Sequence, residues 1–254
     1  MKEFDKELAK QVFSCIDNTT LNATDNEQTV EKFCRHTAEL LIPTSGLIVA
    51  AVCVYPRFVG CARRVLEGTG IRVASVAGAF PHGQLPLPLK VDEVKQVVDD
   101  GADEVDIVIN RGLLLQGHDD VVRDEVSIMK EACGTRTLKV ILETCELPSP
   151  TLLRRAAELA IEGGADFIKT STGKGADGAT PETAMTMLEV IANYVKIYKK
   201  IIGFKAAGGI REPEEALRYA EMAKKILGDG YINNQTFRIG ASRLTDQLHA
   251  LLTI

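Results

Sequence analysis

The chain has 254 residues, with 30 Lys and Arg against 35 Asp and Glu, and 45% of the residues are hydrophobic. This composition excludes a disordered or collagen-like chain. The formal charge of -5 argues against a general nucleic-acid binder, whose surface would be basic.

Short apolar runs rich in β-branched residues alternate with longer, charged amphipathic segments. Such runs are typical of strands buried on both faces of a parallel sheet. They predict eight strands, in chain order at 14–18, 47–55, 71–80, 104–110, 138–144, 166–171, 201–209 and 236–242. The remaining segments predict helices, one before the first strand and the others at 24–41, 87–100, 113–133, 149–163, 181–198, 213–227 and 242–252.

Eight strands that alternate with helices in about 250 residues have the size of a closed (β/α)8 TIM barrel. No low-complexity or Pro/Ser-rich linker divides the chain, so we expect a single domain over 1–254. A doubly wound open sheet is the alternative, but its glycine-rich turn would follow the first strand. Here the glycine-rich segments follow the sixth, seventh and eighth predicted strands, which favours the barrel.

A repeated Gly-Ala-Asp triplet leads into the strands that carry Asp106 and Lys169, and places these two residues at the same strand position. They belong to alternate strands, which share layers inside a barrel, so both side chains point inward or both point outward. An outward position would press charge against the helices, which is costly unless the charge is paired. An inward position would bring an acid and an amine into one layer.

Lys169 and Lys205 each lie near the end of an apolar strand. One interpretation is that both long side chains reach the solvent at the barrel mouth. The other is a reactive pair, since a neighbouring ammonium and burial both lower a lysine pKa. A neutral lysine amine can form a Schiff base with a carbonyl substrate, and a carboxylate can move the protons.

Three glycine segments, at 172–175, 208–211 and 240–243, each follow a strand and precede a helix. Exposed backbone N–H groups at such positions suit a phosphate, although ordinary turns use glycine too. Their position near Lys174 and Arg211 predicts a phosphate site.

The remaining signals concern membranes, metals and location. The longest apolar run, Leu47–Tyr55, has about half of the roughly 20 residues that span a bilayer, so we expect no membrane partner. The four histidines are scattered without ligand spacing, so we expect no metal. The six cysteines form no CxxC pair, and the charged N-terminal segment shows no signal peptide. We therefore expect a cytoplasmic protein.

Several segments closely resemble the deoxyribose-phosphate aldolase family. The most specific are FIKTSTGK at 167–174 and GFKAAGGIR at 203–211. The others extend the likeness over nearly the whole chain: DNTTLN at 17–22, VCVYPRF at 52–58, FPHG at 80–83, GADEVDIV at 101–108 and RIGAS at 238–242.

This resemblance implies a barrel enzyme that reversibly cleaves 2-deoxy-D-ribose 5-phosphate into D-glyceraldehyde 3-phosphate and acetaldehyde, in the catabolism of deoxyribose phosphate. The family's mechanism is class I, without metal or cofactor. Lys169 would form the Schiff base, Lys205 would lower the pKa of Lys169, and Asp106 would donate and accept protons. The resemblance also implies a homodimer or homotetramer.

The resemblance further implies a set of substrate-binding residues. Those that would hold the phosphate are Gly173, Lys174, Gly208, Gly209, Arg211, Gly240 and Ser242. Asp17, Thr20 and Cys53 match positions that line the family's pocket, and packing roles are the alternative for them. Ala206 stands where many members have proline, which predicts a looser turn there.

Two other functions stay open on the residues alone. One is a lysine-imine barrel that uses a different phosphosugar or a keto acid. The other is a catalytically silent protein that binds a phosphosugar, although Lys169, Lys205 and Asp106 together argue against it.

Overall fold

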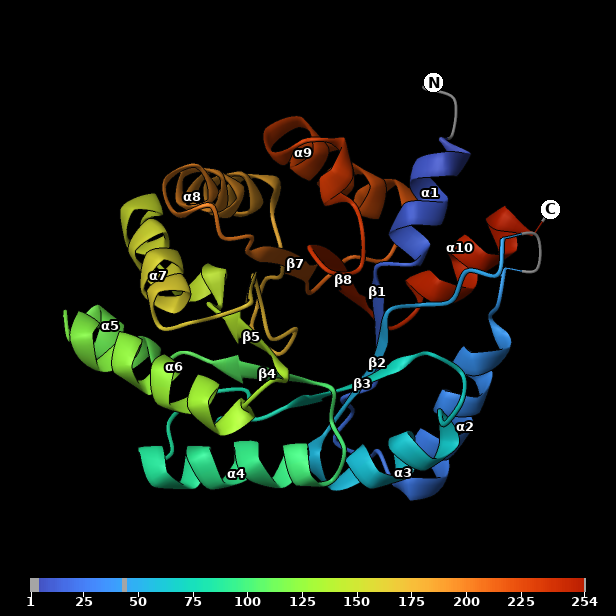
Figure 1. Ribbon diagram of the computed structural model, residues 1–254, viewed down its shortest axis with the longest axis horizontal. Coiled ribbons are helices and arrows are strands. Elements are labelled where there is room, and N and C mark those ends of the chain that lie inside the picture. The colour runs from blue at the N-terminus through green and yellow to red at the C-terminus, as the bar shows by residue number, and fades with distance from the viewer. Residues whose placement is uncertain (1–4, 43–44, 254) are drawn as a thin grey trace.

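In the computed structural model, which describes residues 5–42 and 45–253, eight parallel strands close into a barrel. Each strand pairs with the next in chain order, and β8 pairs with β1. Figure 1 shows the helices around the outside of the strands. The predicted TIM barrel is confirmed, and the open-sheet alternative is wrong because the sheet has no free edge.

Every predicted apolar run overlaps one strand of the barrel, and only β1 and β5 extend beyond their runs, by one residue each. The strands are β1 Ile16–Thr19, β2 Ala51–Val54, β3 Arg72–Val76, β4 Glu104–Val108, β5 Thr137–Ile141, β6 Phe167–Lys169, β7 Gly203–Ala207 and β8 Phe237–Ala241. The observed strands are shorter than the runs, because the residues at the run ends form the turns that lead to the helices.

Most predicted helices agree with the structure within three residues. The helices are α1 Lys6–Phe13, α2 Glu27–Glu39, α3 Val59–Val65, α4 Leu87–Asp99, α5 Arg111–Leu115, α6 Asp119–Cys133, α7 Pro150–Glu162, α8 Pro181–Tyr198, α9 Pro213–Leu227 and α10 Leu244–Leu252. Helix α8 begins after Thr180, whose side chain accepts from the N–H of Thr183, so this cap fixes the start.

One expected helix is wrong, and one observed helix was not expected. The single helix expected at 113–133 is two helices, α5 and α6, because Gly117 adopts φ +79° between them. Helix α3, between β2 and β3, was not expected from the sequence. With seven residues it is too short to establish a helical period, and its last turn carries the exposed Arg63 and Arg64.

The expectation of a looser turn at Ala206 is also wrong, because this residue is not in a turn. It lies inside β7, fully buried, and belongs to the apolar core between the barrel and the helices. Side chains alternate along a strand, so this outward position leaves its neighbour Lys205 facing the barrel interior.

The main core cluster lies between the strands and the surrounding helices, and its apolar packing stabilises the barrel. A second, smaller cluster forms inside the barrel near β1–β3 from Leu21, Ala51, Cys53, Ala74 and Val76. Helix α1 lies beside α9 and α10 on the outside of the barrel (Figure 1). Within the described residues, no helix combines the length and the apolar character needed to cross a bilayer.

Candidate active site

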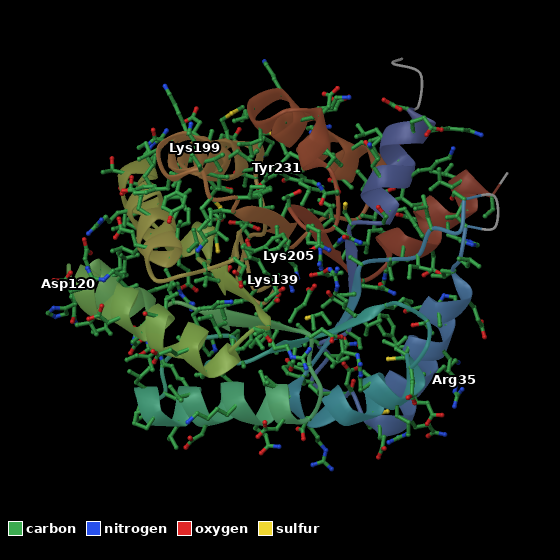
Figure 2. The ribbon with its side chains drawn as sticks, viewed as in Figure 1. Arg35, Asp120, Lys139, Lys199, Lys205 and Tyr231 are labelled. Carbon is green, nitrogen blue, oxygen red and sulfur yellow. The ribbon has the colours of Figure 1, made fainter. Side chains whose placement is uncertain are left out.

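Charged side chains occupy much of the barrel interior. Seven of them are at most 3% exposed, three acids and four bases: Asp17, Glu104, Asp106, Lys139, Lys169, Lys205 and Arg238. Figure 2 shows Lys139 and Lys205 near the centre of the ring of strands, whereas Arg35 and Asp120 lie at the periphery. Burying so many charges is costly unless they are paired, and here they are.

Asp106 on β4 is the hub of this ionic cluster. Its Oδ1 accepts from the Nζ of Lys139 at 2.8 Å. Its Oδ2 accepts from the Nζ of Lys169 at 2.8 Å and from the Nζ of Lys205, also at 2.8 Å. The structure therefore confirms that Asp106 and Lys169 both face inward, in contact within one interior layer. It also brings the two predicted lysines together, since they are register partners on β6 and β7.

A second set of ion pairs joins β1, β4, β5 and β8. Both guanidinium Nη atoms of Arg238 reach the carboxylate of Glu104, at 2.9 and 2.6 Å, and Nη1 also lies 2.5 Å from Oδ1 of Asp17. Lys139 links this set to Asp106, because its Nζ lies 2.6 Å from Oε2 of Glu104. Arg72, which is partly exposed, approaches Glu104 at 3.3 Å from the amino-terminal end of β3.

The sequence analysis missed Glu104, Lys139 and Arg238. A signal for Glu104 was present, since it lies two residues before Asp106 and therefore faces the same side of β4. Lys139 and Arg238 each interrupt an apolar run, as Lys169 and Lys205 do. Their register partners in the barrel are Asp106 and Lys205, respectively.

Burial is the largest influence on Lys169, and it lowers the pKa of this lysine. The nearby ammonium of Lys205 lowers it further, whereas the carboxylate of Asp106 opposes the shift. The predicted effect of a second lysine therefore has the expected direction, but desolvation contributes more. Lys169 is the lysine of the cluster that loses its proton most easily.

The other members of the cluster are held in their charged forms. Burial disfavours the charge on Lys205, but the carboxylates of Asp106 and Asp17 raise its pKa. Burial likewise opposes ionisation of Asp106, yet Lys139, Lys169 and Lys205 hold its pKa well below the usual range. Asp106 is therefore a carboxylate, which makes it a proton acceptor at neutral pH.

A cavity of about 300 Å³ opens above this cluster, at the carboxyl ends of the strands. Lys169 lies at its wall, together with residues from β1, β8 and the loops that follow β1, β6, β7 and β8. All seven residues predicted to hold a phosphate line it, namely Gly173, Lys174, Gly208, Gly209, Arg211, Gly240 and Ser242.

The cavity wall presents unused hydrogen-bond donors. Gly173, Gly208 and Gly209 adopt φ of +74°, +86° and +76°, a left-handed conformation that glycine accepts without strain. Among the described residues, no protein atom accepts from the backbone N–H groups of four lining residues, Gly173, Gly208, Gly209 and Ser242. Free N–H groups beside the exposed side chains of Lys174 and Arg211 can bind an anion.

The three remaining candidates lie outside the cavity lining. Asp17 is buried below it and pairs with Lys205 and Arg238. Thr20 donates its hydroxyl to Oδ2 of Asp25 at 2.8 Å, while its neighbours Thr19, Leu21 and Asn22 line the cavity. Cys53 is fully buried, and this burial raises the pKa of its thiol to about 11.

The part of the chain that the structure describes contains no group of three or more His, Cys, Asp or Glu side chains arranged to hold a metal.

Residues 12–246 match the DeoC/LacD family of aldolases. An aldolase called QR15 is 32% identical, with a TM-score of 0.77, over 93% of this chain and 95% of that chain. A deoxyribose phosphate aldolase from Aeropyrum pernix, described as having a unique tetrameric structure, is 27% identical with a TM-score of 0.73, over 97% and 91% of the two chains. A protein from Toxoplasma gondii ME49, provisionally described as a deoxyribose-phosphate aldolase, is 25% identical with a TM-score of 0.85, over 98% and 94%.

Proposed function

The chain belongs to the DeoC/LacD family of aldolases, and on this premise we propose that it reversibly cleaves 2-deoxy-D-ribose 5-phosphate into D-glyceraldehyde 3-phosphate and acetaldehyde. One observation carries the proposal. Lys169, whose pKa is lowered by burial, donates a hydrogen bond to Asp106. It lies at the wall of a cavity that free N–H donors line. A reactive amine and an anion site in one cavity fit a phosphorylated aldehyde. The named substrates of two relatives support the same choice.

The reaction begins at the amine of Lys169. In its neutral form it attacks C1 of the open-chain sugar and gives a carbinolamine, which loses water to form a protonated imine. The carbon count places the cleavage at the C2–C3 bond, not at C3–C4, because acetaldehyde has two carbons.

The imine then accepts the electron pair of the breaking bond. The C3 hydroxyl loses its proton, C3 becomes the aldehyde carbon of glyceraldehyde 3-phosphate, and C1 and C2 remain on Lys169 as an enamine. Protonation at C2 restores the imine, and water releases acetaldehyde and the free amine. Asp106, ionised and in contact with Lys169, is the group that takes up and returns these protons.

The phosphate group orients the sugar. Bound at the glycine segments after β6, β7 and β8, it holds C1 against Lys169. Such positioning lowers a barrier by roughly 7–11 kcal/mol at best. The dimer or tetramer and the cytoplasmic location stay predictions for this chain.

Borohydride reduction tests the proposal. With deoxyribose 5-phosphate present, we expect a covalent adduct on Lys169, and acetaldehyde release in a coupled assay. Lys169→Met is expected to abolish both. Activity without any trapped lysine would contradict the imine, and equal efficiency with unphosphorylated deoxyribose would contradict the anion site. Trapping with a different phosphosugar, but not with this one, would favour another lysine aldolase of the same family.

A further inference from the structure

Glu143 is a buried carboxylate hydrogen-bonded to Thr172, a residue that lines the cavity, and the reaction described above does not use it. It follows β5 and is 1% exposed. Among the described residues its side-chain partners are Thr172 and Cys145, with no Lys, Arg or His in ion-pair contact. A buried acid without a basic partner is costly, so its hydrogen bonds have to hold it in place.

Those hydrogen bonds converge on Thr172, in the loop after β6. The backbone N–H of Thr172 donates to both carboxylate oxygens of Glu143, each at 3.3 Å. The Thr172 hydroxyl also donates to Oε2 of Glu143. A weaker contact runs from Sγ of Cys145 to Oε1, at 3.9 Å.

The backbone of Glu143 also points to a built arrangement. Its φ of 53° and ψ of 66° lie in the left-handed region, which is unfavourable for a residue with a side chain. The flanking residues hold it there, because Leu142 N–H donates to the carbonyl of Lys169 and Thr144 N–H donates to the carbonyl of Thr170. Glu143 is therefore fixed directly to the strand that carries the reactive lysine.

This arrangement fixes the direction of the Thr172 hydroxyl. A hydroxyl has one hydrogen to donate and two lone pairs that accept. The hydrogen goes to Glu143, and one lone pair accepts from the backbone N–H of Lys174 at 3.0 Å. The second lone pair is left for a ligand, and Thr172 lines the cavity. A ligand group that meets it has to be a hydrogen-bond donor.

We propose that Glu143 is a positioning residue, which orients the Thr172 hydroxyl as an acceptor and so favours substrates with a hydroxyl between the imine carbon and the phosphate. This inference rests on the proposed function, and it deepens it by assigning a source of selectivity. The carboxylate is required for this, because glutamine at 143 could donate to the Thr172 oxygen and turn its hydrogen toward the cavity. The substrate hydroxyl would then have to rotate and accept instead of donating.

Steady-state kinetics with deoxyribose 5-phosphate test the proposal on the full chain. We expect Glu143→Gln to raise KM about tenfold, the effect of one well-made hydrogen bond, with kcat much less affected. Thr172→Val should raise KM by a similar factor, and the double variant should be no worse than either single variant, because both remove the same interaction. Cys145→Ala, which touches the same carboxylate from the exposed side, is the matched control and should keep the wild-type KM.

A second readout separates positioning from general damage. Acetaldehyde has no hydroxyl, so borohydride trapping of acetaldehyde on Lys169 should proceed at the wild-type rate in Glu143→Gln. An unchanged KM in a folded Glu143→Gln, or an equal loss of acetaldehyde trapping, would overturn the proposal. If thermal melting shows that Glu143→Gln does not fold, Thr172→Val decides, and an unchanged KM in that variant would refute it. Failure of the proposed function would appear earlier, as wild-type protein that neither traps nor cleaves the phosphosugar.

Discussion

Lys169 and Lys205 share a single oxygen atom, since the Nζ of each lies 2.8 Å from Oδ2 of Asp106. The whole interior cluster contains four bases against three acids. If one base is neutral, the remaining charges balance. Lys169 is the base whose pKa is lowered, whereas the pKa values of Lys139 and Lys205 are raised. The charge balance of the barrel therefore favours a neutral amine at the proposed nucleophile.

Removal of the Lys205 charge should move the pH dependence of the reaction. Lys205 lowers the pKa of Lys169, so Lys205→Met should raise that pKa. Lys169 attacks in its neutral form, and the acidic limb of kcat/KM should therefore shift to higher pH. Because burial is the larger influence, we expect part of the lowering to persist. A pH profile of deoxyribose 5-phosphate cleavage measures the shift, and an unmoved limb in active, folded Lys205→Met would refute the assigned role.

Two adjacent glycines should respond differently to substitution by alanine. Both Gly208 and Gly209 have positive φ, so Gly209→Ala should cost about 1–2 kcal/mol through its backbone conformation alone, since open space surrounds the added Cβ. In Gly208→Ala the Cβ would also lie 2.8 Å from Cα of Gly178 in the neighbouring loop. That contact should add about 1–3 kcal/mol. Urea unfolding of the two variants measures the difference, and equal losses would show that the two loops are not in close contact.

The buried carboxylates predict the response of stability to acid. Burial opposes their ionisation, but the neighbouring bases lower the folded-state pKa of Asp17, Glu104 and Asp106. The stability they contribute is present above their unfolded pKa of about 4, and it is lost as the pH falls through the lowered folded-state values. We expect the free energy of unfolding to fall by more than about 2 kcal/mol between pH 5 and pH 2. Denaturant titrations across this range test it, and a flat profile would contradict the ionic interior.

Thiol reactivity gives an independent check of burial. Cys145 is exposed, whereas the other five cysteines are buried. Burial raises the pKa of Cys15, Cys34 and Cys133 to about 12, which suppresses the reactive thiolate. Native protein should therefore show one fast thiol with Ellman's reagent, and Cys145→Ala should remove it. Further thiols reacting as quickly would mean that the barrel opens more readily than the packing implies.

The sequence predicts much of this fold because strand burial and helix caps are local signals. All eight apolar runs overlap strands, and α8 and α9 begin and end at the predicted residues. Helix α3 was missed because it is short, and the division between α5 and α6 depends on one glycine conformation. Neither signal extends over enough residues to be read from periodicity.

The candidate site was only partly accessible to the same reasoning. A repeated triplet put Asp106 and Lys169 at the same position of alternate strands, and the lysine motifs carried a family likeness. The partners of Lys139 and Arg238 depend on the stagger between strands, which follows from closure of the barrel rather than from any one strand. The left-handed backbone at Glu143 left no sign in the sequence, because it depends on a hydrogen-bonded loop that is distant along the chain.

The ionic cluster inside the barrel has a consequence for heat tolerance. Hydration of charged groups becomes less favourable on heating, so the penalty for removing these seven side chains from water falls as the temperature rises. Apolar side chains of the same volume would not show this fall in the desolvation penalty, because they carry no charge. Variants that replace the Arg238–Glu104 ion pair with well-packed hydrophobic residues are therefore expected to gain stability at low temperature. The same comparison at high temperature should shift in favour of the native charges.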